Sequence, residues 1–471
     1  MSIALDTQSV ERLWDESALP ALKSFIEIPA KSPHFDPNWQ MNGHLDAALR
    51  LGERFCRDQL PAAEVEIVRL EGRTPLLFVD VPASAGASGS ALIYGHFDKQ
   101  PENTGWSEGF EPWQPRIRDG KLYGRGAVDD GYSLFSVVTA LAALRQAGQP
   151  HPRCVFVVET CEESGSFDLL AYLDHLSERI GHPDLVVCPD AGCGTYDRLW
   201  CTTSLRGMVS GTLRVDVLRE GVHSGDAGGV VPSSFRVLRA LLSRLEDEQS
   251  GRILPQLCHV EIPELRRQQA AHAGAVLGEI TRERFPFLDG VEAQSDDPAE
   301  RILERSWRAA VEVIGAEGLP PIEAAGNVLR PFTSTKLALR LPPTTAGQAV
   351  ADGLQDLLTT APPANAQVAF EVDAVANGWA APEPSAWLSE AIERASREHF
   401  GLDPVYMGEG GTIPFMNWLQ ERFPQADYVV TGLAGPGSNA HGPDEFLHLD
   451  AARRLTACLG EALAALANQP R

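Results

Sequence analysis

The chain has 471 residues, of which 44% are hydrophobic, enough for a sizeable core and for two or three domains. Lys and Arg total 40 against 64 for Asp and Glu, and the net charge of −24 argues against nucleic acid as a partner. The N-terminal segment lacks a basic start, and no run of about 18 or more apolar residues occurs, so we expect neither a secretory signal nor a membrane partner.

The cysteines also favour a cytoplasmic location. There are eight of them, none forms a C-x-x-C pair, and several lie within apolar runs. This usage is typical of reduced, buried thiols in a cytoplasmic enzyme, whereas a disulfide framework would be unusual in so long a chain.

The first half of the chain alternates apolar strands with helical stretches. The segments 91–97, 154–160 and 184–190 are short, apolar and rich in Val and Ile, which predicts buried strands. The segments 133–148 and 167–181 are predicted helices, each ended by a glycine. This order predicts an α/β fold with a mixed, largely parallel sheet.

The pattern changes after about residue 205. Half-exposed strands are predicted by alternation of apolar and polar residues at 206–218, 334–343 and 367–375. Helices are predicted between them at 233–248, 298–315 and 346–360. This segment is therefore predicted to be a smaller α+β domain.

The α/β pattern then returns, with helices predicted at 385–400 and 413–422 and a strand at 427–433. We therefore expect one discontinuous domain, 1–205 and 379–471, interrupted by a second domain, 206–378.

Five polar clusters follow predicted strands or precede helices. They are YGHFD (94–98), GRGAVDDG (124–131), ETCEESG (159–165), CPD (188–190) and SNAHGPDE (438–445). Ligands of open α/β sheets bind at the carboxyl ends of the strands. The clusters bring seven candidate residues there, namely His96, Asp98, Asp129, Glu162, Glu163, Asp190 and His441.

These residue types suit a pair of divalent cations. Imidazole and carboxylate ligands fit Zn²⁺ or Mn²⁺, and two histidines with three carboxylates exceed the needs of one catalytic zinc but suffice for two if one carboxylate bridges. Of the adjacent acids Glu162 and Glu163, one can then bind metal while the other accepts a proton from water. Each cluster alone has an ordinary explanation as a cap, a turn or a surface histidine, but their joint occurrence favours a site.

The motifs GHFD, GRGAVDDG, EESGS and NAHGPDE, in this order, resemble the metallopeptidase family of carnosinase, dipeptidases, glutamate carboxypeptidase, diaminopimelate desuccinylase and aminoacylase. The resemblance covers about residues 10–465. It implies a zinc-peptidase-like catalytic domain interrupted by a lid that also forms a homodimer.

The resemblance also implies roles for the candidate residues. His96 and Asp190 would bind one metal, Glu163 and His441 the other, and Asp129 both. A cis peptide is expected after Asp129. Asp98 would hold His96 through its second ring nitrogen, and Glu162 would be the general acid and base.

In the lid, GVHSG (221–225) resembles the family's dimerisation motif. By that resemblance His223 would enter the partner's active site and stabilise the oxyanion. Asn327 would also bind the oxyanion, while Arg340 and Thr412, the latter in EGGTIP, would bind the substrate's terminal carboxylate.

The expected function is metal-dependent hydrolysis of amide bonds in dipeptides or small peptides with a free C-terminal carboxylate. A deacylase of N-acyl amino acids would use the same machinery and remains an alternative. A non-catalytic binding protein is disfavoured because the base and all five ligands are retained.

Overall fold

The computed structural model describes residues 5–470, which form two compact units. Unit 1 combines Met1–Thr202, Ala381–Tyr406 and Trp418–Arg471, and unit 2 combines Thr203–Ala380 with Met407–Asn417. The division falls within β8 (Trp200–Leu205), β16 (Val405–Glu409) and α15 (Pro414–Arg422). The domain limits inferred from sequence stay a prediction, and the structure adds that the segment Met407–Asn417 belongs with unit 2.

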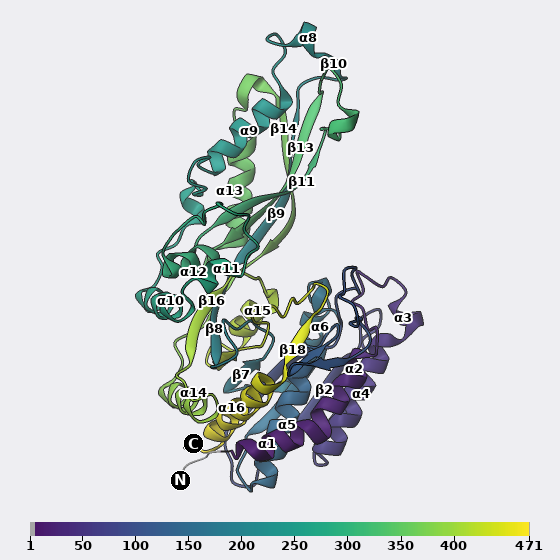
Figure 1. The fold of residues 1–471 in the computed structure, drawn as a ribbon, viewed down its shortest axis with the longest axis vertical. Coiled ribbons are helices and arrows are strands. Elements are labelled where there is room, and N and C mark those ends of the chain that lie inside the picture. Colours follow the sequence, from purple (N-terminus) through teal and green to yellow (C-terminus); the bar gives the residue numbers. More distant parts are fainter. Residues whose placement is uncertain (1–4, 471) are drawn as a thin grey trace. The chain divides into compact units, whose positions relative to one another are not determined.

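Unit 1 contains a six-stranded sheet in the order β1-β2-β6-β3-β7-β17 (Figure 1). Strands β6, β3, β7 and β17 are parallel, whereas β2 is antiparallel to β6 and β1 to β2. Their bounds are β1 Glu64–Val68, β2 Leu76–Val81, β3 Ser90–His96, β6 Arg153–Glu159, β7 Leu185–Cys188 and β17 Asp427–Val430. The carboxyl ends of the four parallel strands therefore share one edge of the sheet.

Unit 1 also contains a three-stranded sheet, β18-β5-β4, while β8 and β16 lie in a further sheet, β15-β8-β16, that the division between the units cuts. The β18-β5-β4 sheet consists of β4 Arg116–Arg118, β5 Lys121–Tyr123 and β18 Phe446–His448. The helices of this unit are α1 Thr7–Leu13, α2 Leu19–Ile26, α3 Trp39–Asn42, α4 His44–Gln59, α5 Tyr132–Gln146, α6 Leu169–His175, α7 Ser177–Ile180, α14 Ala386–His399 and α16 Leu449–Ala467.

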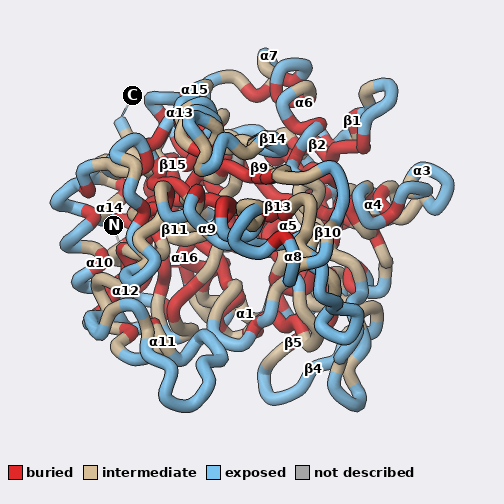
Figure 2. Tube along the Cα trace, turned by 90° about the horizontal axis from the view of Figure 1, so that it is seen from above, coloured by how far each residue is buried: buried red, intermediate tan, exposed pale blue. Residues whose placement is uncertain are grey.

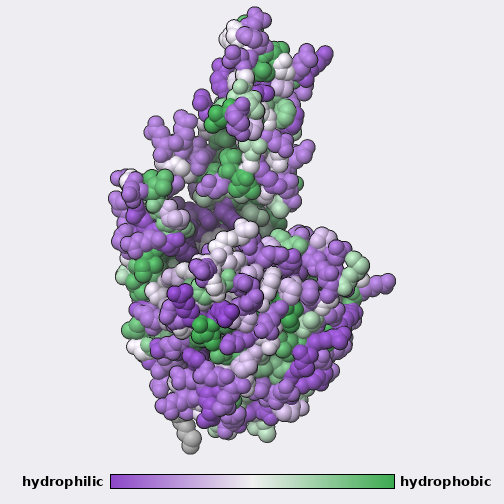
Figure 3. Space-filling view, turned by 45° about the vertical axis from the view of Figure 1, so that its right-hand side comes forward, coloured by the Kyte–Doolittle hydropathy of each residue, from purple (hydrophilic) through white to green (hydrophobic). Residues whose placement is uncertain are grey.

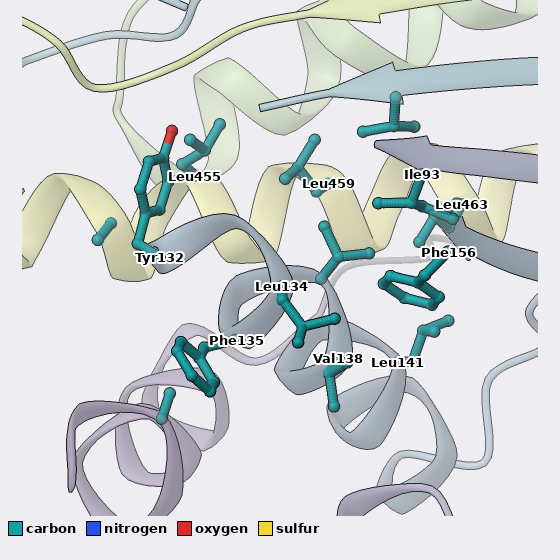
Figure 4. Packing of buried hydrophobic residues seen from close by; sticks show 14 of the residues in the cluster. Ile93, Tyr132, Leu134, Phe135, Val138, Leu141, Phe156, Leu455, Leu459 and Leu463 are labelled. Carbon is teal, nitrogen blue, oxygen red and sulfur yellow. The ribbon is translucent and has the colours of Figure 1, made fainter. Parts of the chain in front are cut away.

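The core of unit 1 lies between its sheet and two apolar helices. In α5 every residue from Tyr132 to Leu144 is buried, and α16 is buried over nearly its whole length (Figure 2). Figure 4 shows Leu134 and Leu141 of α5 and Leu459 of α16 beside Ile93 and Phe156 of the central strands. This packing fixes the strands whose ends carry the candidate site.

Unit 2 contains a four-stranded antiparallel sheet in the order β11-β13-β9-β14. Helices α9 Ser234–Leu245 and α13 Gly347–Thr359 cover one face of it. The other elements are α8 Ser224–Ala227, β9 Gly207–Asp216, β10 Val222–His223, α10 Glu264–Leu277, α11 Ile280–Glu283, α12 Pro298–Ser306, β11 Ala310–Glu317, β12 Val328–Leu329, β13 Phe332–Leu341, β14 Gln367–Ala376 and β15 Trp379–Ala380.

The predicted helix 298–315 is wrong in its second half. Helix α12 ends at Ser306, and residues 310–317 form β11, which pairs with β13. The β-branched residues Val311, Val313 and Ile314 fit a pleated strand better than a helix, and pairing with β13 overrides the helical spacing of their apolar side chains.

The other predicted strands and helices are confirmed to within a few residues, although the predicted helix 167–181 is divided into α6 and α7. The fold is α/β with mixed sheets, as expected. Among residues 5–470, no helix is long and apolar enough to cross a membrane.

Candidate metal centre

Five predicted ligands meet at the carboxyl edge of the unit 1 sheet. His96 is the last residue of β3, while Glu163 and Asp190 lie in the loops that follow β6 and β7. Asp129 lies between β5 and α5, and His441 lies between β17 and β18. The convergence follows from the parallel register, in which His96 pairs with Glu159 and Ile93 with Val187.

The first group of side chains surrounds the Nε2 atom of His96. This atom lies 3.3 Å from Oδ1 of Asp129 and 3.6 Å from Oδ2 of Asp190. His96 is fully buried, whereas the two carboxylates are partly exposed. Although burial opposes the charged ring, the nearby carboxylates of Asp129, Asp98 and Asp190 raise the pKa of His96 well above its usual value.

The second group surrounds the Nε2 atom of His441. This atom lies 2.8 Å from Oδ2 of Asp129 and 3.3 Å from Oε2 of Glu163. The hydrogen bond with Asp129 raises the pKa of His441. The two oxygens of Asp129 thus face different histidines, which is the geometry of a bridging carboxylate.

The side chain of Glu162 lies beside both groups but belongs to neither. Its Oε2 atom is 4.0 Å from Nε2 of His96. Burial raises the pKa of Glu162 well above its usual value, and neighbouring carboxylates add to this effect. A carboxyl group that belongs to neither ligand group stays free to exchange protons.

Asp98 connects His96 to the segment that carries Glu162 and Glu163. Its carboxylate accepts the backbone N–H groups of Glu162 and Glu163 at 3.1 and 3.0 Å. The Nδ1 atom of His96 is 3.1 Å from the backbone oxygen of Asp98 and 3.5 Å from its Oδ1. Asp98 therefore contacts His96 mainly through its main chain, and its carboxylate holds the neighbouring loop.

These residues fit a pair of cations. The Nε2 atom of His96 and the Oε1 atom of Glu163 are buried and have no hydrogen-bond partner within residues 5–470. The carboxylates of Asp129, Glu162, Glu163 and Asp190 also crowd around only two imidazoles. Burial raises the pKa of Asp190 to about 6, and the neighbouring carboxylate of Asp129 adds to this effect.

The predicted oxyanion residues lie together in unit 2. His223 ends β10, pairs with Val328 of β12 and is exposed. The backbone N–H of Ser224 donates to the carbonyl of Asn327 at 2.9 Å, and Asn327 is also exposed. Both lie near the Phe332 end of β13, because Val328, the partner of His223, is only four residues before Phe332, and the backbone N–H of Val217 donates to the carbonyl of Pro331.

The predicted carboxylate-binding residues contact each other at the opposite end of β13. Nη1 of Arg340 donates to Oγ1 of Thr412 at 2.8 Å. Within residues 5–470 no acidic side chain forms an ion pair with Arg340. From Phe332 to Arg340 is eight residues of strand, or about 26 Å at ~3.3 Å per residue.

Two supporting residues had no role in the sequence-based prediction. Nε2 of Gln100 donates to Oε2 of Glu163 at 2.6 Å, and the hydroxyl of Tyr132 donates to the carbonyl of Pro189, directly before Asp190. The only sequence signal was their place next to the clusters at 94–98 and 124–131.

Two histidine–carboxylate groups that share an aspartate, at the carboxyl edge of a parallel sheet, are typical of a metal-dependent hydrolase. The sequence matches Peptidase family M20/M25/M40 over residues 92–465, which is most of the chain. The chain belongs to this metallopeptidase family, and it is an enzyme.

Two curated relatives are dipeptidases. The cysteinylglycine-S-conjugate dipeptidase of Corynebacterium striatum is 27% identical over 374 residues, covering 78% of this chain and 79% of the relative. The human Beta-Ala-His dipeptidase is 26% identical over 446 residues, covering 92% of this chain and 87% of the relative.

Solved structures have the same fold. Human carnosine dipeptidase 1 has a TM-score of 0.74 at 22% identity, covering 98% of both chains. A di-peptidase of Saccharomyces cerevisiae has a TM-score of 0.75 at 21% identity, covering 100% of both chains.

The cis peptide expected after Asp129 is confirmed between Asp129 and Asp130. The eight cysteines are all free and buried, as expected.

Proposed function

We propose that this enzyme hydrolyses the amide bond of dipeptides or small peptides that have a free C-terminal carboxylate. The observation that carries this proposal is the pair of ligand groups joined by Asp129, with Glu162 beside them. Relatives named as dipeptidases support the substrate class.

In this proposal His96 and Asp190 would hold one divalent cation, Glu163 and His441 would hold a second, and Asp129 would contribute to both. Two Zn²⁺ ions, or Mn²⁺ ions, would supply Lewis acidity that makes water more acidic and polarises the scissile carbonyl. Glu162 accepts the proton of the attacking water and delivers it to the leaving amine. Asp98 keeps Glu162 and Glu163 in place through their backbone N–H groups.

Arg340 and Thr412 are proposed to bind the substrate's C-terminal carboxylate. Their contact, and the absence of an acidic partner of Arg340 within residues 5–470, support this role. A guanidinium can bind a carboxylate through two parallel hydrogen bonds, so this subsite selects peptides with a free C-terminus.

His223 and Asn327 are proposed to stabilise the oxyanion in the partner's active site. A dipeptide is about 7 Å long, whereas unit 2 alone separates Arg340 from the His223 end of its sheet by about 26 Å. One copy of unit 2 therefore cannot place both groups on one dipeptide. A second copy can supply His223 and Asn327.

A homodimer through unit 2 accords with its exposed edge strand. Strand β11 is outermost in the sheet, and Val313 and Ile314 on it are 51% and 60% exposed. Apolar side chains are visible on the surface of unit 2 in Figure 3. Unpaired backbone groups beside exposed apolar side chains favour pairing with a second copy. We place the dimer in the cytoplasm, where its free cysteines stay reduced.

Turnover of matched substrates tests the proposed function. Metal-reconstituted enzyme should hydrolyse members of a dipeptide panel, lose activity with a chelator, and act poorly on the same dipeptides when they are C-terminally amidated. Preferred turnover of an N-acetyl amino acid panel would instead assign the deacylase activity.

A further inference from the structure

A buried ion pair joins the loops that carry Asp129 and His441. Nη1 of Arg125 lies 2.6 Å from Oε2 of Glu445, and the two side chains are 1% and 0% exposed. Neither residue is a ligand or contributes to the proposed proton transfer. The pair therefore requires its own explanation.

The carboxylate of Glu445 binds the backbone that leads to Asp129. Its Oε2 accepts the N–H of Gly126 at 3.1 Å, while its Oε1 accepts those of Val128 and Asp129 at 3.1 and 3.4 Å. One side chain thus holds three amides of the segment that ends in the proposed bridging ligand.

The guanidinium of Arg125 binds two further segments of the site. Nη2 donates to the carbonyl of Gly442 at 2.7 Å, directly after His441. Nε donates to the carbonyl of Pro101 at 3.1 Å, in the segment that follows His96. Arg125 therefore ties together the loops of three proposed ligands.

The position of the pair follows from the small sheet of unit 1. Tyr123 of β5 pairs with Phe446 of β18, and the backbone N–H of Gly124 donates to the carbonyl of Glu445 at 3.0 Å. The loop after β5 and the loop before β18 are adjacent for this reason, although Arg125 and Glu445 lie far apart in sequence.

Stability alone explains this pair poorly. Removing two charges from water is costly, and a buried ion pair is often no more stabilising than apolar residues of the same volume. His441 has a φ of +67°, a left-handed conformation that is unfavourable for a residue other than glycine. Hydrogen bonds to the carbonyls of His441, from Asn103, and Gly442, from Arg125, hold that conformation.

We propose that Arg125 and Glu445 are a positioning pair that holds Asp129 and His441 in their ligand-presenting arrangement before any metal binds. This inference rests on the proposed metal centre. Because both ligand groups contain Asp129 but only one contains His441, loss of the pair weakens the group with His441 more.

Calorimetric titration of chelator-treated protein with Zn²⁺ tests the pair. Arg125→Lys keeps the charge but lacks the guanidinium N–H groups that bind Glu445 and the two carbonyls. Glu445→Gln keeps the shape but places an amide N–H donor against N–H donors. Both variants should bind one equivalent of Zn²⁺ about 10–100-fold more weakly than the wild type does, as expected for residues that orient ligands. The affinity for the other equivalent should change less.

Arg153→Lys is the matched control. Arg153 binds Asp80 through Nε at 3.0 Å and the carbonyl of Ile180 through Nη1 at 3.1 Å, but it lies at the amino end of β6, away from the site. This variant should lose stability without losing Zn²⁺ affinity, which separates a positioning role from a general effect on folding.

The possible results discriminate clearly. Wild-type affinity for Zn²⁺ in Arg125→Lys would overturn the inference. This holds even if Glu445→Gln binds Zn²⁺ weakly, because the loss of the Glu445 charge alone would then explain the weaker binding. Wild-type protein that binds fewer than two equivalents would refute the proposed centre instead. If both variants fail to fold, hydrogen exchange on metal-free wild-type protein decides, since the amides of Gly126 and Val128 should be protected and rapid exchange would overturn the preformed pair.

Discussion

Mixing two inactive variants measures whether active sites are shared between subunits. In the proposed dimer each complete site takes Glu162 from one chain and His223 from the other. The His223→Ala and Glu162→Gln homodimers should both be nearly inactive. A mixed dimer has one site with both lesions and one site with none.

The expected recovery follows from counting sites. With equal amounts and random pairing, about half of the dimers are mixed, and half of their sites are intact, so roughly a quarter of wild-type activity should return. The assay is dipeptide hydrolysis after subunit exchange, with exchange verified by native mass spectrometry of chains that differ in mass.

A control mixture uses two variants whose altered residues both belong to the part of unit 2 that is proposed to enter the partner's site. When His223→Ala is mixed with Asn327→Ala, each site of a mixed dimer receives either the altered His223 or the altered Asn327 from the other chain. No activity above that of the separate variants should therefore return. If His223→Ala and Glu162→Gln exchange subunits and stay inactive, the assignment of His223 to the partner's site is wrong.

Three further predictions concern the site of one chain. Glu162→Gln should bind metal normally but lose about 10²–10⁴-fold in kcat, whereas Glu163→Gln should chiefly weaken metal binding in a calorimetric titration; reversed results would exchange the two roles. Arg340→Ala should raise KM for free dipeptides and leave the poor turnover of amidated dipeptides unchanged, and equal losses on both would indicate a structural role. Removing metal should lower the thermal unfolding midpoint, since a ligand at 100 times its Kd stabilises by about 2.7 kcal/mol, and an unchanged midpoint would argue against metal binding by the folded state.

Local sequence patterns predicted the strands of the unit 1 sheet and the edge of that sheet where the candidate site lies. Segments such as 154–158 are apolar over their whole length, and a polar cluster follows at once at 159–165, so both the strands and their functional ends were visible in the sequence. The parallel pairing of β3 with β6 and β7 then brings the clusters together.

Features that depend on long-range contacts were not predictable in this way. Residues 310–317 form a strand because β13 lies beside them, and nothing within that segment specifies this partner. Arg125 and Glu445 were both visible within recognised motifs, but their pairing depends on the β5–β18 register. The carboxylate of Asp98 was expected to hold His96, and its contacts with the amides of Glu162 and Glu163 depend on the turn after β6.

The order of the proposed ligands along the chain also bears on synthesis. His96, Asp129 and Asp190 all precede unit 2, whereas His441 follows it. A chain still emerging from the ribosome can therefore assemble its first ligand group, but the second must wait until nearly the whole polypeptide has been made. Strand β17 and helix α16 arrive equally late, so completion of the second proposed ligand group and closure of the core of unit 1 belong to the same final stage of maturation.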